Sequence, residues 1–138
     1  MIFREDINTR KIYKFEREYF WGEPSLPMKM LQDLANKIWE SEGKEEPLPR
    51  VVSGKGTKYS GRYFSYFDGE KIELARSERK RTVLIHEMVH ALGYDEHDDG
   101  FACKYFELLE QFAGCSHREL LYIGIEYKLV EEPEADIW

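Results

Sequence analysis

Apolar residues recur at helical spacing in the first third of the chain and predict two helices. Residues 8–21 place Ile12, Phe15, Tyr19 and Phe20 on one face, and Gly22 ends the pattern. A second helix is expected from a Ser25 N-cap to about residue 42, with a proline in its first turn. Its apolar face comprises Met28, Leu31, Leu34, Ala35, Ile38 and Trp39.

The period of the pattern changes to two after residue 49, which predicts strands. Residues 50–53 contain two adjacent valines and look like a short strand, and residues 62–67 alternate between two faces. Asp68-Gly69 is a strong hairpin signal, and residues 71–75 provide the returning strand. We therefore expect a small antiparallel or mixed sheet in the middle of the chain.

Helical spacing returns between Glu78 and Leu92, which contain neither glycine nor proline. Ser77 is the expected N-cap, and Gly93 is suited to the left-handed turn that ends a helix. An apolar stripe from Phe101 predicts a further supporting helix; it comprises Phe101, Tyr105, Leu108, Leu109 and Phe112.

The last part of the chain is expected to hold a short helix and one strand. Ser116 and Glu119 have capping-box spacing for a helix ending near Gly124. A strand is predicted for residues 125–130, followed by a mobile acidic tail over residues 130–138. Together these elements predict an α+β fold in a single domain, residues 1–138.

Composition and charge narrow the classes of protein. Hydrophobic residues make up 42% of the 138 residues, as in globular proteins. No run is long and apolar enough for a membrane span and no signal peptide is visible, so the cytoplasm is the expected compartment. Two cysteines do not suggest a disulfide framework.

The net charge of −7 is unevenly distributed along the chain. Residues 1–81 contain 17 Lys and Arg against 14 Asp and Glu, whereas residues 82–138 contain 3 against 13. An acidic second half favours binding of a cation and disfavours a polyanion there. A basic cluster at Arg76, Arg79, Lys80 and Arg81 is interpreted as the solvated start of the following helix, with contact to nucleic acid as the alternative.

The most specific chemical signal is His86-Glu87-x-x-His90. Residues four apart in a helix differ by about 40° in direction, so both imidazoles can reach one ion. A catalytic zinc takes three protein ligands and a water, and Glu87 can act as general base on that water. His97 is the leading third ligand; the alternatives are Asp95, Glu96, Asp98, Asp99, Glu107 and Glu110.

These residues resemble the motifs of the SprT-like and WLM groups of zincin metalloproteases. In those groups a third His is followed four residues later by Phe, as His97 is by Phe101; Asp98 after His97 is similar to the WLM form. The chain also resembles a family of small metallohydrolases from actinobacteria and their phages, whose N-terminal Asp, Arg and Tyr pattern is matched by Asp6, Arg10 and Tyr13.

The resemblance implies a zincin-like fold, with His86, His90 and His97 as zinc ligands and Glu87 as the catalytic residue. The function we expect is a zinc metallopeptidase acting on polypeptides. A peptide could add to strand 71–75 or a neighbouring strand. Candidates for stabilising an oxyanion are Tyr94, Tyr105 and His117.

Two other functions remain open at the level of sequence. The same metal-bound water could hydrolyse a non-peptide substrate such as RNA, since Gly93-Tyr94-Asp95 loosely resembles part of a bacterial RNA-maturation hydrolase motif. Alternatively, zinc could stabilise a binding module that has no turnover. Glu87, which zinc binding does not need, argues against this last function. The sequence does not give the oligomeric state.

Overall fold

The computed structural model describes residues 1–133 and confirms the α+β class. In these residues it contains five α-helices, one three-stranded sheet and one two-stranded sheet. The contacts divide into two compact units. Residues 23–93 form one unit, and residues 1–22 with the described residues from 94 onward form the other. The single-domain assignment stays a prediction.

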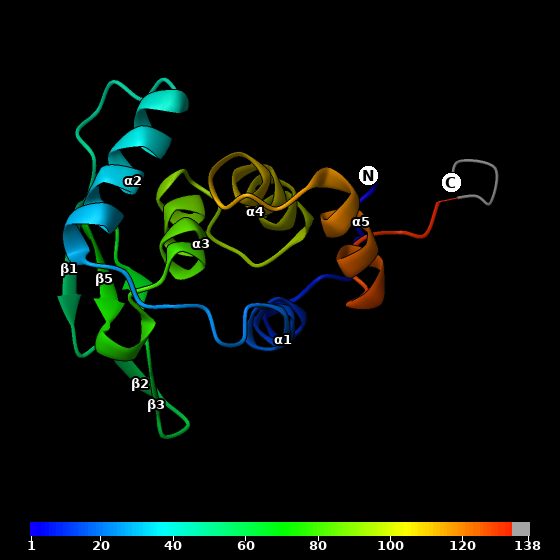
Figure 1. Ribbon diagram of the computed structural model, residues 1–138, viewed down its shortest axis with the longest axis horizontal. Helices are drawn as coiled ribbons and strands as arrows, with labels where there is room; N and C mark the ends of the chain where they lie inside the picture. The colour runs from blue at the N-terminus through cyan, green and yellow to red at the C-terminus, as the bar shows by residue number, and fades with distance from the viewer. Residues whose placement is uncertain (134–138) are drawn as a thin grey trace. The chain divides into compact units, whose positions relative to one another are not determined.

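The unit of residues 23–93 is built on a mixed three-stranded sheet with order β1-β5-β4. Strand β1 (Arg50–Gly54) is parallel to β5 (Lys71–Ala75), and β4 (Tyr66–Phe67) is antiparallel to β5. Helix α2 (Met28–Ser41) packs on β1 and on α3 (Arg81–Ala91), which packs on β4 and β5. Both helices therefore lie on one side of the sheet (Figure 1).

The position of β5 corrects one expectation. It lies between β1 and β4, so residues 71–75 are not an edge strand to which a peptide could add. The edges of this sheet are β1 and β4. The sequence signal for the β4–β5 hairpin is confirmed, because Asp68 Oδ1 accepts hydrogen bonds from the backbone N–H groups of Glu70 and Lys71 in the turn.

The single strand predicted for residues 62–67 is also wrong. It is divided into β3 (Arg62–Phe64) and β4 at Ser65. The Ser65 hydroxyl donates to Glu78 Oε1 and accepts from the Ala75 N–H, which removes Ser65 from the regular ladder. β3 instead pairs with β2 (Thr57–Tyr59), a hairpin not anticipated from the sequence.

Neither of the two predicted serine caps in this unit is observed. Helix α2 begins after Pro27 without a side-chain cap. Residues Arg76–Glu78 form a 3₁₀ turn (η1), so α3 begins at Arg81 rather than after Ser77. The carboxylate of Glu23 accepts from both the N–H and the hydroxyl of Thr82. A residue distant in sequence therefore accepts the hydrogen bond of a backbone N–H in the first turn of α3.

The second unit contains α1 (Thr9–Tyr19), α4 (Asp99–Phe112) and α5 (His117–Glu126). The side chain of Ser116 caps α5 as predicted, and the side chain of Asn8 caps α1. Its core is aromatic. Phe15 is fully buried and contacts the rings of Tyr105, Phe106 and Tyr127.

The predicted strand over residues 125–130 is wrong. Helix α5 continues to Glu126, and Lys128 then adopts a positive φ of 58° that reverses the chain. Val130 forms an isolated antiparallel bridge with Phe3 and is 2% exposed. The start of the expected tail is thus buried, and residues 134–138 lie outside the described part of the chain.

Candidate metal centre

His86 and His90 lie on one face of α3, as their spacing predicts. Their ring centroids are 5.0 Å apart with an interplanar angle of 66°. His86 is 2% exposed, whereas His90 is half-buried. The helix is fixed beneath them by its buried apolar residues Leu84, Ile85, Met88 and Val89. Helical geometry and a packed core thus hold two imidazoles in a defined position.

Gly93 ends α3 directly after the histidine pair. Its φ is +110°, a conformation that residues with a Cβ adopt only with strain. The N–H of Gly93 bonds to the His90 carbonyl, and the chain then leaves the helix axis. The sequence-based role of Gly93 is therefore confirmed. This turn brings the chain to His97 within four residues.

His97 is held by contacts with α1 and α4. Its ring meets the ring of buried Phe101 edge-on, with centroids 4.9 Å apart, and lies 5.3 Å from the ring of Tyr13. The next residue, Asp98, caps α4 by accepting from the Phe101 N–H. Thr9 Oγ1 lies 3.0 Å from His97 Nδ1.

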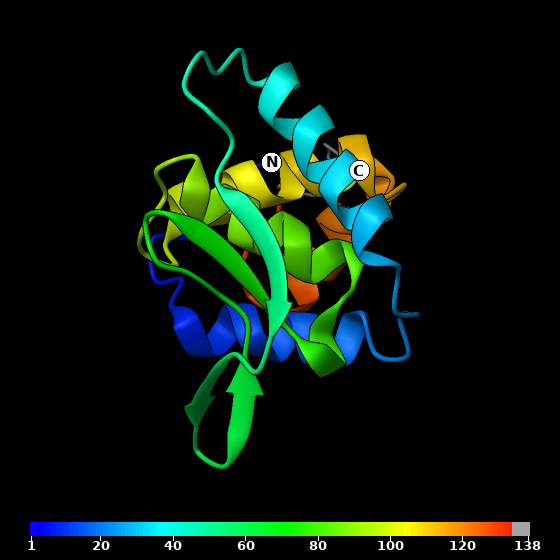
Figure 2. The same cartoon turned by 90° about the vertical axis from the view of Figure 1, so that its left-hand side faces the viewer.

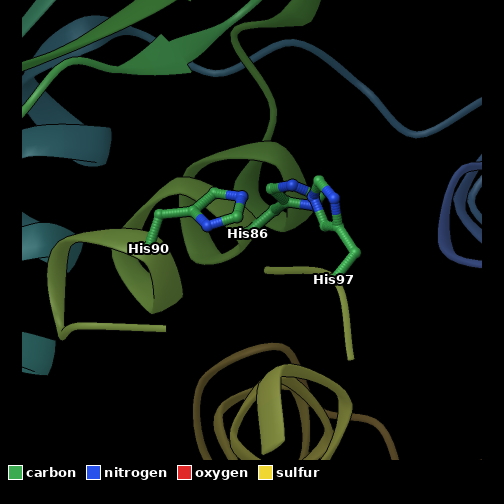
Figure 3. Close-up of side chains that lie close together, drawn as sticks. All are labelled: His86, His90 and His97. Atoms are coloured by element: carbon green, nitrogen blue, oxygen red, sulfur yellow. The ribbon is translucent and has the colours of Figure 1, made fainter. Parts of the chain in front are cut away.

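Ligand atoms of His86, His90 and His97 all lie within 4.8 Å of one another (Figure 3). Residues 1–133 were found to contain one group of at least three His, Cys, Asp or Glu side chains that could hold a metal ion, and it consists of these histidines. Tetrahedral bonds of about 2.05 Å place ligand nitrogens roughly 3.3 Å apart. Small imidazole rotations would close the remaining gap, so the residues fit a metal ion.

The carboxylates considered as alternative third ligands do not belong to this group. Asp98 and Asp99 bond to backbone N–H groups at the start of α4. On the same helix, Glu107 pairs with Lys104, and Glu110 pairs with His117. Asp95 and Glu96 are exposed in the connecting loop. His97 is therefore the third residue that the structure brings to the pair.

Glu87 directly follows His86 and is buried, with 6% of its surface exposed. As the residue following His86, it projects from α3 in a different direction from the two imidazoles. Burial of an ionisable carboxyl costs free energy unless the group is hydrogen-bonded or paired with a charge. Its place next to the candidate ligands is the one that the motif predicts for a general base.

The three candidates for an oxyanion donor differ in availability. The Tyr105 hydroxyl donates its proton to Glu16 at 2.7 Å, and the residue is fully buried. This hydroxyl is therefore not placed to donate to an oxyanion. His117 is exposed and faces Glu110. Tyr94 is half-buried in the loop between Gly93 and His97, so it is the candidate closest in sequence to the three histidines.

Sequence reasoning missed Thr9, since no local pattern links it to a residue 88 positions away. Tyr13, noted only through the family resemblance, does reach His97. Asp6 instead forms surface ion pairs with Arg4 and Lys11, and hydrogen bonds from these cations hold the pKa of its carboxyl well below the usual value. In the N-terminal pattern, Asp6 therefore forms surface ion pairs, whereas Tyr13 contacts His97.

Comparisons with known proteins add no identification. No protein-family model matches the chain, and no curated protein or solved structure shows significant similarity to it. No helix within residues 1–133 has the length and apolar character to cross a membrane. The site therefore has to be interpreted from its own geometry and chemistry.

Proposed function

We propose that this chain is a zinc-dependent hydrolase that cleaves peptide bonds. The observation behind this proposal is the convergence of His86, His90 and His97, with a buried Glu87 directly after the first of them. A structural metal site needs the imidazoles but does not need a general base beside them. A hydrolase needs both.

The donor set favours zinc over the other common ions. Three neutral imidazoles and no carboxylate suit a borderline metal in tetrahedral coordination, whereas magnesium and calcium prefer oxygen ligands. Three protein ligands also leave a fourth position open, which is typical of catalytic rather than structural zinc. When bound, zinc would supply a water of lowered pKa and would polarise the carbonyl of the substrate.

Glu87 then performs the proton transfers in the proposed reaction. Its carboxylate accepts a proton from the attacking water and delivers it to the nitrogen of the leaving amine. The overall geometry that we propose is zincin-like. An extended peptide could pair with the edge strand β4, which packs against α3, instead of with the central strand β5.

The test compares Glu87→Gln with the wild type in a chelator-reversible assay on an unstructured protein and on a degenerate fluorogenic peptide library. We expect the variant to retain its zinc and to lose at least about 100-fold in hydrolysis, because general acid–base catalysis contributes about 10²–10⁴-fold. Glu107→Gln is the matched control, since this exposed residue on α4 lies outside the metal group.

The other outcomes separate the alternatives. Full hydrolysis by Glu87→Gln would refute the catalytic assignment. Stoichiometric zinc with no hydrolysis of peptides or of structured RNA by the wild type would favour a zinc-stabilised binding module. RNA cleavage that depends on Glu87, without peptide cleavage, would retain the hydrolase and overturn the substrate class.

A further inference from the structure

The β2–β3 hairpin contributes no residue to the candidate metal centre. It forms a two-stranded sheet of its own, joined by a Ser60-Gly61 turn in which both residues have positive φ, 50° and 78°. Every residue from 57 to 63 is exposed. The hairpin extends away from the three-stranded sheet of the same unit (Figure 2).

Each face of this hairpin presents a tyrosine opposite a cation. Lys58 is the cross-strand partner of Tyr63, and Tyr59 is the partner of Arg62. Tyr59 is 73% exposed, so its ring contributes little to a core. On the Tyr63 face, Lys55 adds a second ammonium, 5.2 Å from the ring centroid. An isolated two-stranded hairpin is only marginally stable in water, and exposed rings beside cations form a surface that a ligand can contact.

The charge of this segment is opposite to that of the chain. Residues 47–67 contain four cations, Arg50, Lys55, Lys58 and Arg62, and no acidic residue, whereas the whole chain carries −7. Three of the four cations belong to the hairpin or its immediate approach. A partner that recognises this surface must therefore be anionic and must offer planar groups to the tyrosines.

We propose that the β2–β3 hairpin binds single-stranded nucleic acid. Lysine and arginine contact the phosphates, and unpaired bases stack on Tyr59 and Tyr63; this combination is typical of proteins that bind single strands without strong sequence preference. A duplex hides the faces of its bases and offers only phosphates. A lipid surface fits less well, because the tip of the hairpin is Ser60-Gly61 and has no apolar side chain to insert.

The test measures fluorescence anisotropy of labelled oligothymidylate and oligouridylate, with a duplex of equal length and anionic vesicles as competitors. For the full-length protein at low salt, we expect Tyr59→Ala to weaken binding about tenfold and Tyr59→Phe to leave it unchanged, because stacking requires the ring and not the hydroxyl. Replacing Lys58 and Arg62 by Gln should make the negative slope of log K against log[salt] shallower by about 1.4.

Lys29→Gln with Lys37→Gln is the matched control, because it removes the same charge from exposed positions on α2. The control should bind like the wild type. Equal losses in the control and hairpin variants, tighter binding of the duplex or of vesicles, or no binding of single strands at low salt would each overturn the proposal. All substitutions are at exposed positions, and circular dichroism verifies that the variants fold.

Discussion

Replacing Thr9 with valine should weaken metal binding without unfolding the protein. Thr9 Oγ1 lies 3.0 Å from His97 Nδ1. A neutral imidazole carries one N–H, and the nitrogen that binds a metal must be the other one. We infer that Nδ1–H donates to Thr9 and that Nε2 is the ligand atom. Valine has nearly the same shape but cannot accept this hydrogen bond.

The magnitude follows from the exposure of the contact. Loss of a partner that orients a metal-binding histidine typically costs 10- to 100-fold in affinity. Thr9 is exposed, so water can replace part of the hydroxyl's function. We therefore expect the lower end of that range, about tenfold, or about 1.4 kcal/mol. Thr9→Ser keeps the hydroxyl and should bind zinc as the wild type does.

The assay is competition for zinc with a chromophoric chelator, combined with long-range ¹H–¹⁵N spectra of the histidine rings. Wild-type His97 should show a protonated Nδ1, and addition of zinc should shift the Nε2 signal. An unchanged zinc affinity in Thr9→Val, or a metal-induced shift at Nδ1, would refute the assignment. Thermal unfolding of the metal-free variants verifies that their stabilities match.

Three further substitutions test the packing and the turns. Phe101→Ala should lower the free energy of unfolding by about 3–5 kcal/mol, measured by urea titration, because its ring is fully buried. Gly124→Ala should destabilise the protein by about 1–3 kcal/mol, although alanine usually favours a helix, because its Cβ would lie 2.5 Å from Val130 Cγ2; a gain in stability would show that the packing is looser. Backbone N–H groups of Lys71 and Glu70 lower the pKa of Asp68, so its stabilising effect is present above about pH 4 and is lost as the pH falls further. Asp68→Asn should therefore reduce the acid sensitivity of unfolding, and an unchanged pH profile would contradict this.

Local patterns predicted the parts of the site that depend on neighbouring residues. The spacing of His86 and His90, the turn at Gly93 and the buried Phe101 each follow from a single helix or turn. His97, the leading candidate for a third ligand, also lies with this histidine pair. These features are local, so helix periodicity and turn chemistry are sufficient to place them.

Features that depend on distant residues were missed. The cap of α3 is supplied by Glu23, from 59 positions away, and not by Ser77. Hydrogen bonds from Ser65 to Glu78 and from Ala75 to Ser65 break a strand whose alternation looks continuous. Such contacts are set by tertiary structure, which overrides local propensity.

The missed β2–β3 hairpin is a different case, because a local signal for it was present. Ser60-Gly61 separates two short alternating segments, and a glycine at the second turn position is typical of a two-residue hairpin loop. Gly54, Gly56 and Gly61 also lie close together here, and such a density of glycine is typical of irregular turns rather than of strands. In the structure, Lys58 pairs with Tyr63 and Tyr59 pairs with Arg62 across the two strands.

Zinc stoichiometry in two histidine variants tests the central claim most directly. His97→Ala removes a member of the metal group, whereas His117→Ala removes an exposed histidine outside it. Elemental analysis after dialysis against a weak chelator should find about one zinc per chain in the wild type and in His117→Ala, and a large loss in His97→Ala. Wild-type zinc content and affinity in His97→Ala would contradict the three-histidine site.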